Sequence, residues 1–187
     1  MTELVQLASE LQSFFEEKDW RFCFIGGFAL QHWGEQRLTK DVDATLFTGF
    51  SGEEGFVDAL LAEYEARRPD MREFALRNRV LLLQAKDGLP FDIALGALPY
   101  EERMVSRAVR VDFGGPSPLR ICTAEDLIVL KAFAERERDW LDVETILIRQ
   151  QGKIDWPYIL EQLTPLAELK ESPAILDRLA KLRSKQE

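Results

Sequence analysis

Three aspartates carry the most chemistry of any residues in this chain. Asp41 and Asp43 open an apolar run at 42–47, and Asp92 is the one charged residue of a second apolar run at 90–95. Residues i and i+2 of a strand point to the same side, so the carboxylates of Asp41 and Asp43 are expected to face one spot. A carboxylate in the middle of an apolar strand is costly to desolvate unless a cation or hydrogen-bond donors meet it. We therefore expect Asp92 to have a partner.

Two adjacent glycines, Gly26 and Gly27, precede the aspartates. They follow an apolar stretch at 21–25 that predicts a buried strand, and 28–33 predicts a short helix. Such a turn leaves backbone N–H groups and a helix N-terminus free of side chains, which suits phosphate groups. Hard cations such as Mg²⁺ take carboxylate oxygens together with substrate phosphates, and two ions can clamp the attacking and leaving oxygens. The glycines and aspartates together predict phosphoryl or nucleotidyl transfer.

The composition limits the class of protein. The chain has 187 residues, of which 46% are hydrophobic and 30% charged, as is typical of a globular protein with one domain or one domain and a helical appendage. No apolar run approaches the roughly 18 residues that span a bilayer, and the N-terminus lacks the basic region of a signal peptide. We expect a cytoplasmic protein with no membrane partner.

Metal and nucleic-acid chemistry are also constrained. One histidine and two scattered cysteines exclude a zinc site, so any metal must be held by oxygen ligands. The net charge of -9 argues against a surface that coats nucleic acid. Basic residues are nevertheless dense between 103 and 138, so a local site for a small anion stays open.

The periodicity predicts a mixed fold of helices and strands, α/β (α+β). We expect a small mixed sheet, flanking helices and a helical C-terminal lobe. Up to residue 122, helices are expected at 2–18, 28–33, 53–68 and 98–108, and strands at 21–25, 42–47, 71–76, 80–85, 90–95, 109–113 and 119–122. A Gly and Pro cluster at 114–118 marks the boundary between a domain at 1–115 and a lobe at 116–187. The lobe begins with a capping box at 123–126 and continues with helices near 139–150, 156–169 and 173–185.

A family resemblance rests on motifs that occur in order. Gly-Gly-Phe-Ala-Leu at 26–30, Thr-Lys-Asp-Val-Asp at 39–43 and the isolated Asp92 resemble the DNA polymerase β-like nucleotidyltransferase superfamily. With Arg37 before the second motif and Thr-Ala-Glu-Asp-Leu-Ile-Val-Leu-Lys-Ala at 123–132, the chain looks like the AbiEii/AbiGii-type branch, which contains toxins of type IV toxin–antitoxin systems. The match covers most of residues 20–150. Many members carry Gly-Ser in place of the two glycines, so a serine contact to phosphate is missing here.

The resemblance implies a role for each matching residue. Asp41 and Asp43 would bind Mg²⁺ or Mn²⁺, and Asp92 would be the third metal ligand or the base that takes a proton from the acceptor hydroxyl. The glycine pair, Gly26 and Gly27, would hold a nucleoside triphosphate, and Lys131 would reach its phosphates from the helical lobe. The implied reaction moves a nucleoside monophosphate from the triphosphate to a hydroxyl and releases pyrophosphate.

Several partners and functions remain open. The acceptor could be the 3′ end of a tRNA, another protein or a small molecule, and a toxin-like chain would have a cognate antitoxin. An RNA acceptor would need a local basic patch to offset the net charge of -9. One alternative is a non-catalytic protein of the same fold that binds nucleotide or serves as a scaffold. Another is an aminoglycoside- or lincosamide-type nucleotidyltransferase, which would need an acidic acceptor pocket for a cationic drug.

Each residue also has a purely structural interpretation. The glycine pair alone could be an ordinary strand-to-helix turn, and an isolated Asp-x-Asp could be a cap followed by a solvated residue. On spacing alone, Lys131 is expected to be a solvated helix residue. Asp139 and Asp142 are expected to be an N-cap and an exposed acid in the first turn of a helix. The order of the motifs along the chain favours the functional interpretation.

Overall fold

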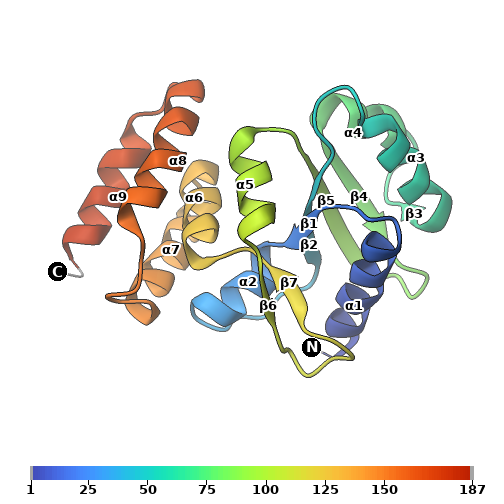
Figure 1. The fold of residues 1–187 in the computed structure, drawn as a ribbon, viewed down its shortest axis with the longest axis horizontal. Coiled ribbons are helices and arrows are strands. Elements are labelled where there is room, and N and C mark those ends of the chain that lie inside the picture. The colour runs from blue at the N-terminus through green and yellow to red at the C-terminus, as the bar shows by residue number, and fades with distance from the viewer. Residues whose placement is uncertain (1, 186–187) are drawn as a thin grey trace. The chain divides into compact units, whose positions relative to one another are not determined.

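A mixed β-sheet is formed by strands between residues 22 and 121 (Figure 1). The computed structural model describes residues 2–185. Within them the sheet has seven strands in the order β3-β4-β5-β2-β1-β7-β6. The strands are β1 (Phe22–Phe24), β2 (Val42–Phe47), β3 (Glu65–Ala66), β4 (Val80–Gln84), β5 (Pro90–Gly96), β6 (Val109–Val111) and β7 (Leu119–Ile121).

Helices flank the sheet and make up the C-terminal part of the chain, so the α+β fold class predicted from the sequence is confirmed. The first five are α1 (Thr2–Glu17), α2 (Gly26–Trp33), α3 (Glu53–Glu63), α4 (Met71–Asn78) and α5 (Pro99–Arg107). The last four are α6 (Ala124–Ala134), α7 (Glu137–Arg149), α8 (Trp156–Leu169) and α9 (Ala174–Ser184). In the described part of the chain, no helix is both long and apolar enough to cross a membrane.

Strands β2 and β5 lie side by side in the middle of the sheet. They are parallel, and Asp43 pairs with Asp92. Side chains alternate along each strand, so the neighbouring residues Phe91 and Ile93, both fully buried, lie on the opposite face from Asp92. Helix α1 covers that opposite face, where the ring of Phe15 packs 5.0 Å from that of Phe22. The aspartates therefore lie on the face that α1 leaves uncovered.

One expected strand is wrong. Residues 71–76 form part of helix α4, and the expected helix at 53–68 ends at Glu63, after which β3 begins. Met71 and Ala75 are both buried and lie four residues apart, which is the helical period. Arg79 ends the helix in the left-handed conformation with φ 56 and leads into β4. The eight-residue segment is too short for its helical period to stand out in the sequence.

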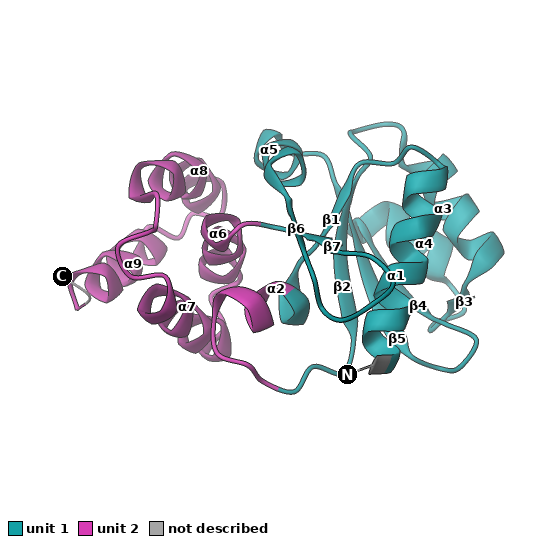
Figure 2. Ribbon diagram, turned by 60° about the horizontal axis from the view of Figure 1, so that its bottom comes forward, with its two compact units in different colours: residues 1–28, 38–122 teal, residues 29–37, 123–187 magenta. Residues whose placement is uncertain are grey.

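The chain divides into two compact units (Figure 2). Unit 1 contains residues 1–28 and 38–122, and so the whole sheet; unit 2 contains 29–37 and 123–187. The border lies inside α2, whose first residues belong to unit 1. Unit 2 has its own apolar core of Leu127, Ile128, Val143, Ile146, Ile159, Leu163, Ile175 and Leu179. The sequence-based boundary after residue 115 stays a prediction.

Candidate nucleotide and metal site

Gly26 is the point at which β1 turns into α2. Its φ is +55, a conformation that side chains with a Cβ rarely adopt. A Cβ built on Gly26 would lie 2.0 Å from Oδ2 of Asp43, so only glycine leaves room for that carboxylate. The Ile25 N–H also donates to the Asp43 carbonyl oxygen at 2.9 Å. The glycine turn and Asp43 are therefore in direct contact.

Gly27 makes a similar approach to the connector that leads into β2. A Cβ on Gly27 would lie 2.3 Å from Oγ1 of Thr39. That hydroxyl is 3.2 Å from both the carbonyl oxygen and Oδ1 of Asp41, the residue directly before β2. Thr39 thus orients Asp41 beside the glycine turn. This role of Thr39 was not predicted, because a threonine in a connector gives no sequence signal of its own.

The two strand aspartates are neighbours on one face. Asp43 and Asp92 hold matching positions on parallel strands, which places their Cα atoms about 4.8 Å apart. Burial raises the pKa of the Asp92 carboxyl above its ordinary value, the Arg67 guanidinium opposes that rise, and the negative charge of Asp41 adds to it. The three aspartates from the sequence analysis therefore belong to one region of unit 1.

Arg67 is the charged partner that Asp92 was expected to need. Its guanidinium donates to Oδ1 of Asp92 in a close ion pair, and both side chains keep 32% of their surface exposed. Arg67 was not predicted as a site residue, because residues 53–68 were expected to form one helix. The strand β3 instead brings Arg67 alongside β4, and its side chain reaches the aspartate face.

The donor set suits a hard divalent cation. Carboxylates are the ligands that Mg²⁺ and Mn²⁺ prefer, and Mg²⁺ is often held by only one or two of them, with water and substrate phosphates completing its shell. Across residues 2–185, no group of three or more His, Cys, Asp or Glu side chains is gathered so that it could hold a metal by itself. Asp43, in contact with Gly26, and Asp92, its cross-strand neighbour on β5, fit an ion that arrives with a nucleotide.

Lys131 lies inside unit 2, in a different environment from the one expected on spacing. It is 9% exposed, and its ammonium donates to Oδ1 of Asp139 at 2.9 Å and to Oδ2 of Asp142 at 2.7 Å. Arg37 donates to both oxygens of Asp142, at 3.3 and 3.2 Å. The expectations of a solvated lysine and an exposed Asp142 are wrong, because these groups form one buried ion-pair network.

Asp139 departs from its expected role as well. Helix α7 begins at Glu137 with Arg136 at its N-cap position, so Asp139 lies in the first turn instead of capping the helix. Its side chain is turned inward to Lys131, and the residue is 7% exposed. Lys131 as a ligand of nucleotide phosphates stays a prediction.

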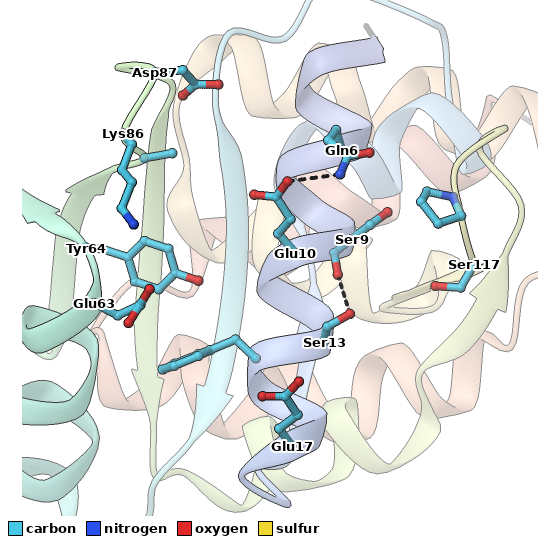
Figure 3. Close-up of a pocket in the computed structure, with 13 residues that line it drawn as sticks. Gln6, Ser9, Glu10, Ser13, Glu17, Glu63, Tyr64, Lys86, Asp87 and Ser117 are labelled. Carbon is cyan, nitrogen blue, oxygen red and sulfur yellow. Dashed lines mark hydrogen bonds between the residues drawn. The ribbon is translucent and has the colours of Figure 1, made fainter.

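A groove on the other face of the sheet is separate from the aspartates (Figure 3). It has a volume of about 530 Å³ and lies between α1, the β4–β5 hairpin and residues 116–117. The Tyr64 ring lines it and packs 5.0 Å from the ring of Phe91, which alternates with Asp92 along β5. The groove therefore opens on the side of Phe91, away from Asp92.

The groove is acidic. Glu10, Glu17, Glu63 and Asp87 line it together with one cation, Lys86, and the phenol of Tyr64 points into it in Figure 3. Burial, followed by the charges of Glu63 and Glu10, raises the pKa of Tyr64 to about 12.

Comparison with known proteins supports the fold. No family model and no curated protein sequence matches this chain. Among solved structures it resembles an antigenic nucleotidyltransferase-like protein from Paracoccidioides brasiliensis, with a TM-score of 0.50 and 15% identity over 98% of this chain and 88% of the other. This likeness defines the class of fold as nucleotidyltransferase-like.

The descriptions of two weaker matches name an antibiotic or an adenylylated antibiotic as the bound molecule. The lincosamide antibiotic adenylyltransferase LnuA, in its lincomycin-bound form, has a TM-score of 0.49 and 12% identity over 73% of this chain and 92% of that enzyme. ANT(2")-Ia in complex with adenylyl-2"-tobramycin has a TM-score of 0.46 and 17% identity over 100% of both chains.

Proposed function

We propose that this protein is a metal-dependent nucleotidyltransferase that moves a nucleoside monophosphate from a nucleoside triphosphate to a hydroxyl acceptor and releases pyrophosphate. One observation carries the proposal: Asp43 lies against Gly26 and in register with Asp92, within a nucleotidyltransferase-like fold. Carboxylates beside a side-chain-free turn are what a cation and the phosphates it binds require.

Five residues of unit 1 have a part in this reaction. Asp41 and Asp43 would hold the cation, which when bound would offset the charge of the transferring phosphate. Backbone N–H groups at Gly26 and Gly27 face the phosphate oxygens, since neither glycine has a side chain to block them. Asp92 would either share the cation or accept the proton of the acceptor hydroxyl.

Lys131 has a conditional role. As a phosphate ligand it would offset charge on the departing pyrophosphate, but its ammonium is already bonded to two carboxylates. We expect it to bind phosphate only by exchanging one of these partners. The alternative is a purely structural role, in which Lys131 only neutralises Asp139 and Asp142.

The acceptor is the least constrained part of the proposal. The candidates are RNA, including the 3′ end of a tRNA with a cognate antitoxin as partner, another protein, and a small molecule. The acidic groove would suit a cationic drug by charge, but it opens on the face opposite Asp92 and does not supply the acceptor pocket of this site. We therefore leave the acceptor class to direct assay.

The test is a transfer assay with the purified protein, Mg²⁺ and each α-labelled nucleoside triphosphate. Total RNA, purified tRNA, a protein lysate, an aminoglycoside and a lincosamide are offered in separate reactions. We expect label in one of these classes, and at least roughly a 100-fold loss with Asp43→Asn, because the cation loses a ligand. Asp177→Asn, on the exposed side of α9, is the matched control and should keep full activity.

Two results would go against the proposal. Transfer that persists in Asp43→Asn would remove the aspartates from the reaction. Tight binding of a nucleoside triphosphate without transfer to any acceptor class would instead favour the non-catalytic nucleotide-binding alternative.

A further inference from the structure

Arg67 lies in one row with two aspartates across the sheet. Its N–H donates to the carbonyl oxygen of Leu82 at 3.0 Å, next to the last pair of the β3–β4 ladder. Leu82 pairs with Asp92 on β5, and Asp92 pairs with Asp43 on β2. Cross-strand partners point to the same face, so all four side chains share the face of the candidate site.

The geometry explains how Arg67 reaches Asp92. Neighbouring strands lie about 4.8 Å apart, so the Arg67 side chain has to cross one strand, at Leu82, to meet the Asp92 carboxylate. An extended arginine spans this distance, and its guanidinium binds Oδ1 of Asp92. A guanidinium stays charged at any working pH, so a metal ion that takes this oxygen must displace the whole group and cannot rely on proton loss.

We infer that Arg67 is a positioning residue that competes with the metal ion for Asp92 and so makes metal binding depend on the nucleotide. This inference rests on the proposed function. In the absence of nucleotide, Arg67 holds Asp92 and repels a second cation on the same face. A nucleoside triphosphate brings negative charge that both the metal and the released guanidinium can bind. Metal and nucleotide binding are then coupled, and the coupling is reciprocal.

The direction of the effect separates this role from a merely structural one. An arginine that only braces the strand would, on removal, loosen the site and weaken metal binding. If the arginine instead competes with the metal ion, its removal should strengthen metal binding. The affinity for the metal ion alone is therefore the informative quantity, and no turnover is needed to measure it.

The experiment titrates Mn²⁺ against the protein and follows free Mn²⁺ by electron paramagnetic resonance, with and without a non-hydrolysable nucleoside triphosphate. Without nucleotide, Arg67→Ala should bind Mn²⁺ roughly three- to tenfold more tightly than the natural protein. The gain in affinity on adding nucleotide should shrink by a similar factor. Arg67→Gln should behave alike, and provides a second neutral variant of more similar size.

Arg68→Ala is the matched control. Arg68 is the next residue along the chain, and its guanidinium pairs with Asp70 and stacks over the Phe74 ring, so this variant removes a neighbouring ion pair without touching Asp92. It should leave Mn²⁺ affinity unchanged. In an Asp92→Asn background, Arg67→Ala should give no gain in Mn²⁺ affinity, as expected for two groups that interact directly.

The outcomes distinguish the inference from the function on which it rests. Equal or weaker Mn²⁺ binding by folded Arg67→Ala and Arg67→Gln overturns the inference. If no variant binds Mn²⁺ at millimolar concentration, the metal site and the inference both fall. If Mn²⁺ binding strengthens as expected but no acceptor is labelled, the inference stands and the proposed transfer activity fails.

Discussion

At the scale of single residues, the site depends on a glycine that nothing larger could replace. Asp43 occupies the space in which a Cβ on Gly26 would lie, and the left-handed φ of Gly26 aims the start of α2 at that carboxylate. The position of the Asp43 carboxylate therefore depends on the missing side chain at Gly26. A substitution at Gly26 should act on Asp43 as well as on the backbone.

Gly26→Ala is expected to lower stability and displace Asp43. The left-handed backbone alone costs an alanine roughly 1–2 kcal/mol, and the contact with Asp43 adds to that cost. The matched control is Gly88→Ala, since Gly88 also has a positive φ but has nothing within 4 Å of an added Cβ. Urea unfolding should show the larger loss for Gly26→Ala, and only that variant should lose Mn²⁺ binding. Equal losses in both variants would mean that the contact with Asp43 does not matter.

Ionisation of Tyr64 should make the stability of the folded protein fall at high pH. Its pKa of about 12 exceeds the ordinary 10.0, so the folded protein keeps the phenol proton to higher pH than the unfolded chain. The stability from this group is complete below pH 10 and is lost as the pH rises toward 12. Tyr64→Phe keeps the ring contacts and removes the proton, so the unfolding free energy of the variant should fall less than that of the natural protein over this window. Parallel curves from pH 9 to 12 would contradict the assignment.

At the scale of elements, a buried charge network joins α6 to α7. Lys131 on α6 bonds to Asp139 and Asp142 on α7, and Arg37 from the connector after α2 adds a second cation at Asp142. Burying charges is favourable only when each keeps its partners. The network therefore fixes how these elements pack within unit 2.

Lys131→Met should destabilise unit 2 whether or not Lys131 binds phosphate. The variant leaves the buried Asp139 with one remaining cation, the exposed Arg136, whose Nε lies 3.6 Å from Oδ2 of Asp139. We therefore expect the free energy of unfolding in urea to fall by about 3–5 kcal/mol. Adding Asp139→Asn should recover part of the loss. Lys153→Met, at an exposed position, serves as the control. If Lys131→Met is as stable as the control, the ion pairs contribute little, and any loss of transfer in that variant reports on phosphate binding directly.

The elements also show which structure the sequence could and could not predict. The strand–glycine–helix turn and the Thr123 cap were predictable, because both depend on neighbouring residues: Oγ1 of Thr123 accepts from the Asp126 N–H at 3.3 Å. Helix α4 and strand β3 were not predictable, because both are short and have mixed patterns. Strand β3 lies where the end of a helix was expected, and α4 lies where a strand was expected. Arg67 was missed for that reason alone.

At the scale of the whole molecule, the site depends on pairing between distant parts of the chain. Asp43 and Asp92 meet because β5 inserts beside β2 in parallel, and no local pattern specifies that register. The family resemblance supplied what periodicity could not, by placing Asp92 with the first two aspartates. It did not indicate the burial of Lys131, which depends on the packing of α6 against α7.

The net charge of -9 belongs to this scale as well. A strongly acidic protein repels RNA at long range, and that repulsion is screened by salt. If RNA is the acceptor, transfer should therefore accelerate as salt rises from low concentration, until screening also weakens local basic contacts. A small-molecule acceptor would show no such rise.

The central claim is that this protein breaks the bond between the α- and β-phosphates of a nucleotide. The most direct test compares transfer from α-labelled and γ-labelled nucleoside triphosphate to the same acceptor in the presence of Mg²⁺. We expect α-label to enter the acceptor and γ-label to leave as pyrophosphate in equal amount, and we expect Asp43→Asn to abolish both. Label from the γ position in the acceptor, or release of inorganic phosphate alone, would contradict it.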